Sequence, residues 1–221
     1  MPRRKLLVTL LLAVILCCFL AGTRFESRQR DPLDYSKSLE LAAVTVNGET
    51  LTLRQMAFYV AYEEAQVERD ALLYDEKHPT RYWNTNMGGS YVRVSARNAA
   101  MEMAVHDEIF YRMAEDEGIQ LTDEEEEYLR KAENDFWGDL SETGGDKRMG
   151  ITEQDIMDTM RKITLAEKYQ RIYALLHNAS FEDYDFTREA YQELLKEQDY
   201  KIHEAVWKRV SFGSVTLHHG S

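Results

Sequence analysis

The feature that most constrains the fold is a long helical pattern between residues 91 and 117. Its apolar residues and one histidine step by four, three, four and three positions, so they share one face of a helix. These residues are Ala99, Met103, His106, Phe110 and Met113. Only 3 Pro and 11 Gly occur in 221 residues, which favours long helices over many short strands. The sequence therefore predicts a mainly α fold.

Capping signals and breaks place the other helices. Thr followed three residues later by Glu or Gln is typical of a helix start, and this spacing occurs at Thr52 and at Thr122. Thr152 begins a further helix, whose buried side we expect to continue to Leu176. Gly118 gives the 91–117 helix a Schellman-type end. The predicted helices start near residues 52, 91, 122, 152 and 186, and the last ends near residue 197.

Short strands are predicted at both ends of the helical region. Ala42–Val46 and Glu49–Leu53 flank Asn47-Gly48, which is the strongest short signal for a β-hairpin turn. Residues 200–212 are rich in β-prone residues and are interpreted as a terminal strand. We therefore expect an N-terminal hairpin, a multi-helix module and a short C-terminal strand.

The N-terminus carries a targeting pattern. Arg3, Arg4 and Lys5 precede the apolar run Leu6–Gly22, an order that is typical of a charged n-region and a hydrophobic segment. Residues 1–23 are interpreted as an uncleaved signal anchor or a cleaved signal peptide. Residues 24–41 are polar and are interpreted as a tether. We expect the folded part to lie on the extracytoplasmic side of the cell membrane, or to be secreted if the segment is cleaved.

Cysteine usage and charge exclude several classes of partner. Cys17 and Cys18 both lie in the apolar run, so the rest of the chain has no disulfide or thiol nucleophile. Lipid modification of either cysteine stays an alternative to the anchor. A cysteine-free ectodomain fits a bacterial cell surface. The net charge of -12 disfavours nucleic-acid binding and adsorption of the folded part to anionic lipid headgroups.

Catalytic and metal-binding patterns are missing from the sequence. It contains no Gly-rich phosphate loop, no G-x-S-x-G and no His-Glu-x-x-His. His106 has no second ligand at a metal-binding spacing, so we interpret it as a partly buried, hydrogen-bonded histidine. We expect no catalytic residue, no metal and no cofactor.

The order of these pieces resembles the helical chaperone module of the SurA and PrsA type, which is related in architecture to the substrate-binding part of trigger factor. The matching residues are Val46, Asn47, Gly48, Leu51 and Thr52 in the hairpin, and Ala114, Gly118, Ile119, Leu121, Thr122, Asp123 and Glu125 at the helix junction. The resemblance assigns residues 42–199 to the module. It implies an all-α cradle for unfolded or partly folded secreted polypeptides.

The resemblance leads to one expected function and two alternatives. We expect a membrane-anchored extracytoplasmic chaperone, a holdase or a foldase-like protein, that performs no catalysis. Related proteins often carry a parvulin-type prolyl isomerase domain, and residues 200–221 look similar to the start of one. The first alternative is an isomerase-related protein whose catalytic domain is lost or supplied elsewhere. The second is an envelope scaffold dedicated to one partner.

Side chains for client binding are drawn from the Met and aromatic residues of the helical region. Flexible Met side chains adapt to varied partners, which suits a surface that binds many sequences. The candidates are Met56, Phe58, Tyr59, Trp83, Met103, Phe110 and Met113. Each could instead belong to the core, and for Trp83 we favour a hydrophobic plug packed under its loop.

Overall fold

The computed structural model describes residues 31–218, and within this range the protein is mainly helical with a small antiparallel sheet. This confirms the mainly α character that the sequence predicts. The signal-like segment 1–23 and the first part of the predicted tether lie outside the described residues. Between residues 31 and 218, no helix is both long enough and apolar enough to cross a bilayer.

The sheet brings together strands from both ends of the described chain. β1 (Ala42–Val46) pairs antiparallel with β2 (Glu49–Thr52) across the turn at Asn47-Gly48, where both residues have positive φ. β5 (Tyr200–Ile202) pairs antiparallel with the other side of β1, so the strand order is β2-β1-β5. The central position of β1 fixes the C-terminal region on the N-terminal hairpin.

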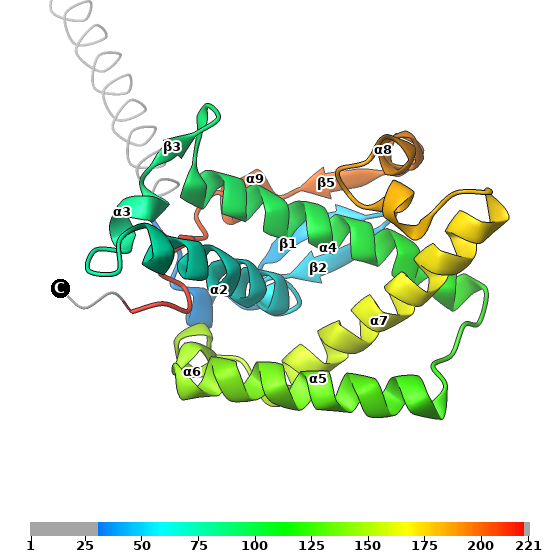
Figure 1. Ribbon diagram of the computed structural model, residues 1–221, viewed down its shortest axis with the longest axis horizontal. Helices are drawn as coiled ribbons and strands as arrows, with labels where there is room; N and C mark the ends of the chain where they lie inside the picture. The colour runs from blue at the N-terminus through cyan, green and yellow to red at the C-terminus, as the bar shows by residue number, and fades with distance from the viewer. Residues whose placement is uncertain (1–30, 219–221) are drawn as a thin grey trace, which may run out of the picture.

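Four long helices form most of the body (Figure 1). They are α2 (Ala57–Tyr74), α4 (Val92–Asp116), α5 (Asp123–Glu142) and α7 (Glu153–Leu176). α4 lies against the sheet, α7 crosses α4, and α5 runs back beside α7. The shorter elements are η1 (Tyr35–Lys37), α3 (Thr80–Trp83), β3 (Asn86–Met87), β4 (Ser90–Tyr91), α6 (Gly145–Met149), η2 (Phe181–Tyr184), α8 (Glu189–Leu195) and α9 (Glu204–Trp207).

The capping chemistry explains where the later helices begin and end. Thr122 and Glu125 form a complete reciprocal capping box at α5. At the end of α4, Gly118 has a φ of 65° and the Ile119 N–H donates to Ala114 O at 2.9 Å, as in a Schellman motif. The first predicted box differs, because Gln55 accepts from the Thr52 N–H but α2 begins only at Ala57.

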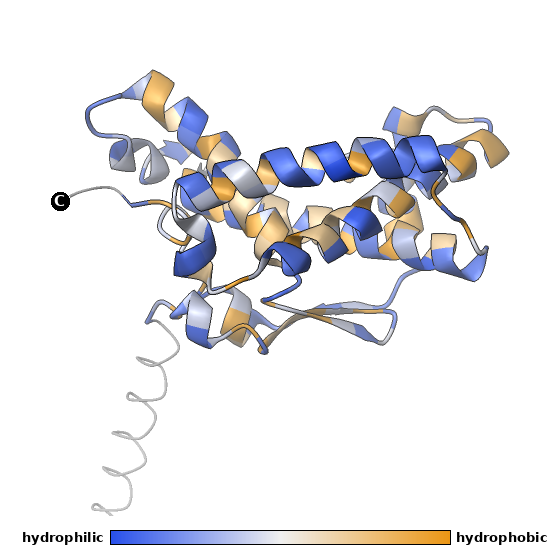
Figure 2. Ribbon diagram, turned by 90° about the horizontal axis from the view of Figure 1, so that it is seen from below, coloured by the Kyte–Doolittle hydropathy of each residue, from blue (hydrophilic) through white to orange (hydrophobic). Residues whose placement is uncertain are grey.

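One core lies between the sheet and the helices. Val44 and Val46 from β1, Met56 before α2, and Ile109 and Phe110 from α4 are almost fully buried in it. Figure 2 shows α5 as the long helix nearest the viewer, with a mainly hydrophilic outer side and apolar helices behind it. The apolar sides of the sheet and of α4 face each other, and their mutual burial stabilises the fold.

The predicted tether is wrong for its second half. Tyr35 and Leu39 are buried, and the Tyr35 hydroxyl donates to Leu53 O at 2.6 Å. The Leu33 N–H donates to Arg209 O at 2.9 Å. Residues 33–41 therefore belong to the folded body. Their lack of an apolar period reflects an irregular segment that packs through single side chains.

Two other predicted boundaries need correction. The terminal strand is limited to Tyr200–Ile202, because His203 caps α9 and residues 208–217 run as turns and irregular chain. Leu176, expected on the buried side of α7, is 70% exposed because it lies at the helix end beyond the packed part. The helix predicted for residues 186–197 is shorter and is α8.

Candidate functional site

An apolar groove lies between α4, α8, β5 and α9. Its volume is about 180 Å³, less than that of a typical small-molecule pocket and close to the size of one or two side chains. Its apolar lining residues are Met101, Val105, Phe186, Tyr191, Leu195, Ile202 and Trp207, and its polar rim includes Arg97, Asn98, Glu102, Gln192, Glu204 and Lys208. Its size and lining fit the side chains of a peptide.

Tyr191 supplies a polar group to the groove lining. Its side chain is 2% exposed, and its hydroxyl has no hydrogen-bond partner among the described residues. Burial raises the pKa of Tyr191 well above its usual range, so the hydroxyl stays a neutral donor. An unpaired buried hydroxyl is unfavourable.

The outer edge of β5 borders the same groove. The backbone N–H of His203 donates to Ala43 O at 2.8 Å, and the backbone O of Asp199 accepts from the Asn47 N–H at 2.6 Å. Because backbone direction alternates along a strand, Tyr200 and Ile202 turn their backbone groups away from β1. Within residues 31–218, β1 is the only strand paired with β5. This edge can therefore accept the backbone of an extended chain.

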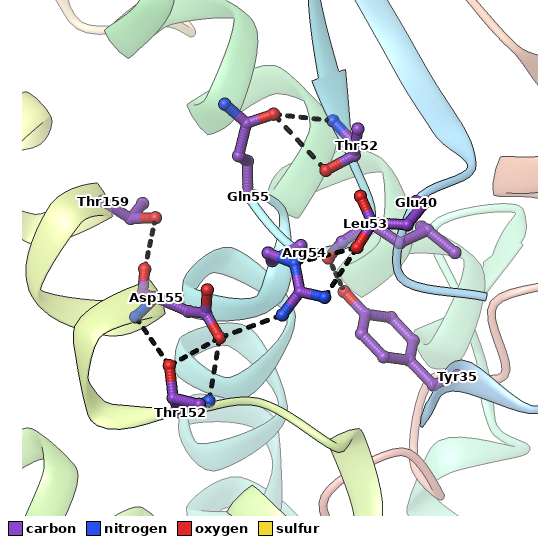
Figure 3. Close-up of polar contacts among 9 residues, drawn as sticks. All are labelled: Tyr35, Glu40, Thr52, Leu53, Arg54, Gln55, Thr152, Asp155 and Thr159. Carbon is purple, nitrogen blue, oxygen red and sulfur yellow. Dashed lines mark hydrogen bonds and ion pairs between the residues drawn. The ribbon is translucent and has the colours of Figure 1, made fainter. Parts of the chain in front are cut away.

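A second, larger cleft separates the hairpin and α2 from α4 and α7. It has a volume of about 550 Å³ and a strongly charged lining. Arg54 lies on one wall and pairs with Glu40 at 2.6 Å and with Asp155 at 3.2 Å (Figure 3). The same Asp155 carboxylate accepts from the N–H and hydroxyl of Thr152 and caps α7. This network fixes the start of α7 to the chain around the hairpin.

The opposite wall of this cleft holds a buried carboxylate. Glu108 is 3% exposed and accepts from Arg112 Nε at 2.6 Å, with Lys162 Nζ at 3.7 Å. Tyr111 lies beside this group, and burial together with a hydrogen bond to Glu115 raises its pKa to about 12. Because these charged groups already have partners within the protein, fewer of them are available to bind a ligand in the cleft.

No family model matches the chain, and no curated protein or solved structure shows significant similarity to it. The resemblance to the SurA and PrsA type of module therefore stays a prediction.

The client-binding candidates do not form one surface. Met56, Tyr59, Trp83 and Phe110 are buried in the core, so they are not accessible to a partner in this structure. The other three, Phe58, Met103 and Met113, are partly buried and pack against the core. Of the seven, Met56, Met103, Phe110 and Met113 lie on helical faces that the sequence predicted to point inward, and the accessible apolar groove is built from other residues.

Trp83 occupies the position expected of a plug. It is 1% exposed, and its indole N–H donates to Glu68 Oε2 at 2.9 Å. Its ring lies against Gly213, where an added Cβ would come within 2.7 Å of the indole. The irregular link before α4 therefore anchors the C-terminal segment to the core.

His106 is buried and hydrogen-bonded, as its sequence context predicted. Its Nδ1 lies 2.8 Å from Asp107 Oδ1 and its Nε2 lies 3.0 Å from Tyr184 O. Its ring contacts Phe110 and Tyr191 with centroid separations of 5.0 and 4.8 Å. Among the described residues, no group of His, Cys, Asp or Glu side chains has the arrangement of a metal site.

Glu64 is a carboxylate that α2 buries together with apolar residues such as Val60 and Ala71. It is fully buried and accepts hydrogen bonds from four successive backbone N–H groups and one hydroxyl. The donors are the N–H groups of Gly213, Ser214, Val215 and Thr216 and the Thr216 hydroxyl. Burial raises the pKa of Glu64, and these hydrogen bonds act in the opposite direction. The carboxylate is a structural clasp for the C-terminal segment.

Sequence reasoning missed the residues that line the groove. Leu195 and Ile202 are the last residues of the short elements α8 and β5, and Tyr191 lies in the same seven-residue helix as Leu195. Periodicity over such short stretches carries little information. The local order of elements was informative: the predicted helix at 186–197 is followed directly by β-prone residues from 200, which places a helix and a strand next to each other in the chain.

Proposed function

We propose that the chain is a membrane-anchored extracytoplasmic chaperone that binds unfolded secreted polypeptides without catalysing a reaction on them. The observation that carries this proposal is the apolar groove along the outer edge of β5. The N-terminal sequence pattern supports the membrane attachment, and the resemblance stated above supports the class of client.

An extended polypeptide fits this arrangement in two ways. Its backbone can pair with the outward groups of Tyr200 and Ile202, which is independent of client sequence. Its side chains on one face can enter the groove next to Leu195 and Trp207, which selects apolar segments. Backbone pairing tolerates many client sequences, and the small apolar groove adds a preference for apolar side chains. This combination suits weak binding of many clients.

The aggregation of an unfolded test protein measures this function directly. We expect residues 31–221 to slow aggregation without accelerating isomerisation of a prolyl peptide. Leu195→Glu places a charge in the groove and is expected to weaken the protection severalfold. Leu175→Glu is the matched control, because Leu175 is 77% exposed at the end of α7 and lies outside the groove.

The outcomes separate the proposal from its alternatives. Equal protection by both variants would show that the groove does not bind the client. Prolyl isomerisation well above background would instead favour the isomerase-related alternative. Tight binding to one envelope partner, with no protection of unrelated proteins, would favour the dedicated scaffold. Circular dichroism and thermal unfolding check that both variants keep the fold.

A further inference from the structure

Four basic side chains gather around the point where the described chain begins. Arg93 and Arg97 lie in the first turns of α4, and Lys208 and Arg209 follow α9. Together with Pro32 they line a shallow depression of about 160 Å³. The cluster stands out in a chain with a net charge of -12.

The positive charge of this cluster is only partly neutralised. Lys208 pairs with Glu204 at 3.3 Å. The three arginines instead donate to neutral oxygens: Arg97 to Lys208 O, Arg209 to Asp31 O and Arg93 to Trp83 O. Within residues 31–218, none of these arginines forms an ion pair. The cluster has four basic side chains, and the acidic residues named beside it are Glu204 and Asp31, so a local excess of positive charge remains.

The backbone holds the cluster beside the N-terminal segment. Arg209 binds Asp31 O at 2.9 Å, and the Arg209 carbonyl accepts from the Leu33 N–H at the same distance. Trp207 Nε1 donates to Arg97 O at 3.3 Å and fixes α9 on α4. The basic cluster therefore cannot move away from residue 31 while the protein is folded.

The length of the preceding chain limits how far this surface can lie from a membrane. Eight residues, 23–30, separate the apolar run Leu6–Gly22 from Asp31. Fully extended, they span at most about 28 Å. These eight residues carry Arg24, Arg28 and Arg30 against one acid, Glu26, and so add further positive charge.

An exposed apolar tip adjoins the cluster. The β3–β4 hairpin and α9 both lie beside the N-terminal end of α4 (Figure 1). Met87 is 47% exposed and Tyr91, which directly precedes α4, is 54% exposed. Tyr is common at membrane interfaces because it has an apolar ring and a polar hydroxyl.

We propose that this face, formed by Arg93, Arg97, Lys208 and Arg209 with the β3–β4 tip, rests on the anionic phospholipid headgroups of the membrane that holds the anchor. The proposal rests on the membrane attachment in the proposed function. The net charge predicts repulsion from such lipids, but headgroup attraction acts over about one Debye length and depends on the local charges. Each basic residue near an anionic surface strengthens association by about fivefold.

The test uses the full chain in vesicles, with Cys17 and Cys18 replaced by Ser and one new cysteine for a fluorophore. Ala205→Cys reports on the basic face, and Asn134→Cys on α5 is the control position; both residues are exposed. Lipids with a headgroup-linked quencher measure proximity. We expect strong quenching at position 205 in vesicles of phosphatidylcholine with phosphatidylglycerol, and weak quenching in phosphatidylcholine alone. Position 134 should show weak quenching in both.

Charge variants link the quenching to the cluster. Arg93→Gln, Lys208→Gln and Arg209→Gln combined should reduce quenching at position 205 to its level in phosphatidylcholine. The control removes the same charge elsewhere, through Arg130→Gln, Lys131→Gln and Lys196→Gln, whose native side chains are exposed. This control should leave the quenching unchanged. Salt at about 0.5 M should reduce quenching in the parent protein, because screening shortens the Debye length to a few Å.

Each contrary outcome has a distinct meaning. Equal quenching in both lipid mixtures, or equal loss in both triple variants, would overturn the headgroup contact while vesicle flotation still supports the anchor. Failure of the full chain to float with vesicles would overturn the membrane attachment and this proposal with it. Loss of quenching in inorganic phosphate, but not in chloride of equal ionic strength, would indicate a site for a free anion instead.

Discussion

The backbone N–H of Gly213 donates to the Glu64 carboxylate at 2.6 Å across a sequence separation of 149 residues. Glu64 lies in the middle of α2, whereas Gly213 lies in an irregular segment close to the C-terminus. A buried carboxylate such as that of Glu64 is costly unless hydrogen bonds replace its hydration. The contact therefore couples the C-terminal segment to the stability of the whole core.

Replacing Glu64 with Gln should destabilise the protein by about 3 kcal/mol. The amide keeps the size of the side chain, but its NH₂ group would face backbone N–H donors that need an acceptor. Glu63→Gln is the control, since Glu63 is half-buried on the same turn and should change stability by less than about 1 kcal/mol. Urea unfolding measures both values. Equal effects would mean that the clasp does not contribute specifically.

A methyl group at Gly213 should also be destabilising. Gly213 has a φ of 89°, and its added Cβ would lie 2.7 Å from the Trp83 ring. Gly213→Ala combines backbone strain with a clash and should cost about 2–4 kcal/mol. At Gly88 the φ is 62° but the space is open, so Gly88→Ala should cost about 1 kcal/mol. Thermal unfolding of the two variants gives the comparison, and a smaller loss at Gly213 would contradict the packing described.

The edge of β5 can be tested at Ile202, which contributes both an outward backbone N–H and one side chain of the groove lining. Ile202→Pro removes an N–H that points away from β1, and Pro is compatible with an edge strand at such positions. We expect the fold to persist and the affinity for an extended apolar peptide to fall severalfold. Lys201→Pro removes an N–H that faces β1 and should instead reduce stability. Fluorescence anisotropy of a labelled peptide, with circular dichroism, separates the two effects.

Acid should weaken the contact between α5 and α7. The hydrogen bond from Lys168 Nζ, at 2.6 Å, lowers the pKa of Glu125 below its ordinary value of 4.5. A lowered pKa in the folded state stabilises the protein above pH 4.5, and this contribution is lost as the pH falls through the folded value. The melting temperature of Glu125→Gln should therefore lie below that of the parent protein at neutral pH, and this difference should become smaller below pH 4.5. Glu124→Gln, on the same exposed turn, should show no such trend.

Residues 31–41 should be required for full stability. Tyr35→Phe removes the hydrogen bond to Leu53 O and should cost about 1 kcal/mol. Deleting residues 31–41 also removes the buried ring and should cost about 3 kcal/mol or more. Tyr128→Phe is the control, because Tyr128 is 75% exposed. Chemical unfolding of fragments that begin at Asp31 and at Ala42 tests this, and equal stability would restore the interpretation of residues 33–41 as a tether.

The sequence by itself determined the features that depend on neighbours a few residues apart. Thr122 with Glu125, the positive φ at Gly118 and the turn at Asn47-Gly48 are local, because each hydrogen bond or backbone requirement is met within about five residues. The helical face that holds His106 and Phe110 is also local, since it follows from the period of the α-helix.

Only the tertiary structure decided which surfaces remain accessible to a partner and which distant segments pack against each other. β5 borders a groove because it pairs with β1 from the other end of the chain, and Tyr35 is buried because Leu53 lies beside it. Glu64 is explained by donors that lie about 150 residues away. The four basic residues near Asp31 come from α4 and from the chain after α9. Their proximity is a property of packing, because net charge and periodicity contain no information on which distant segments meet.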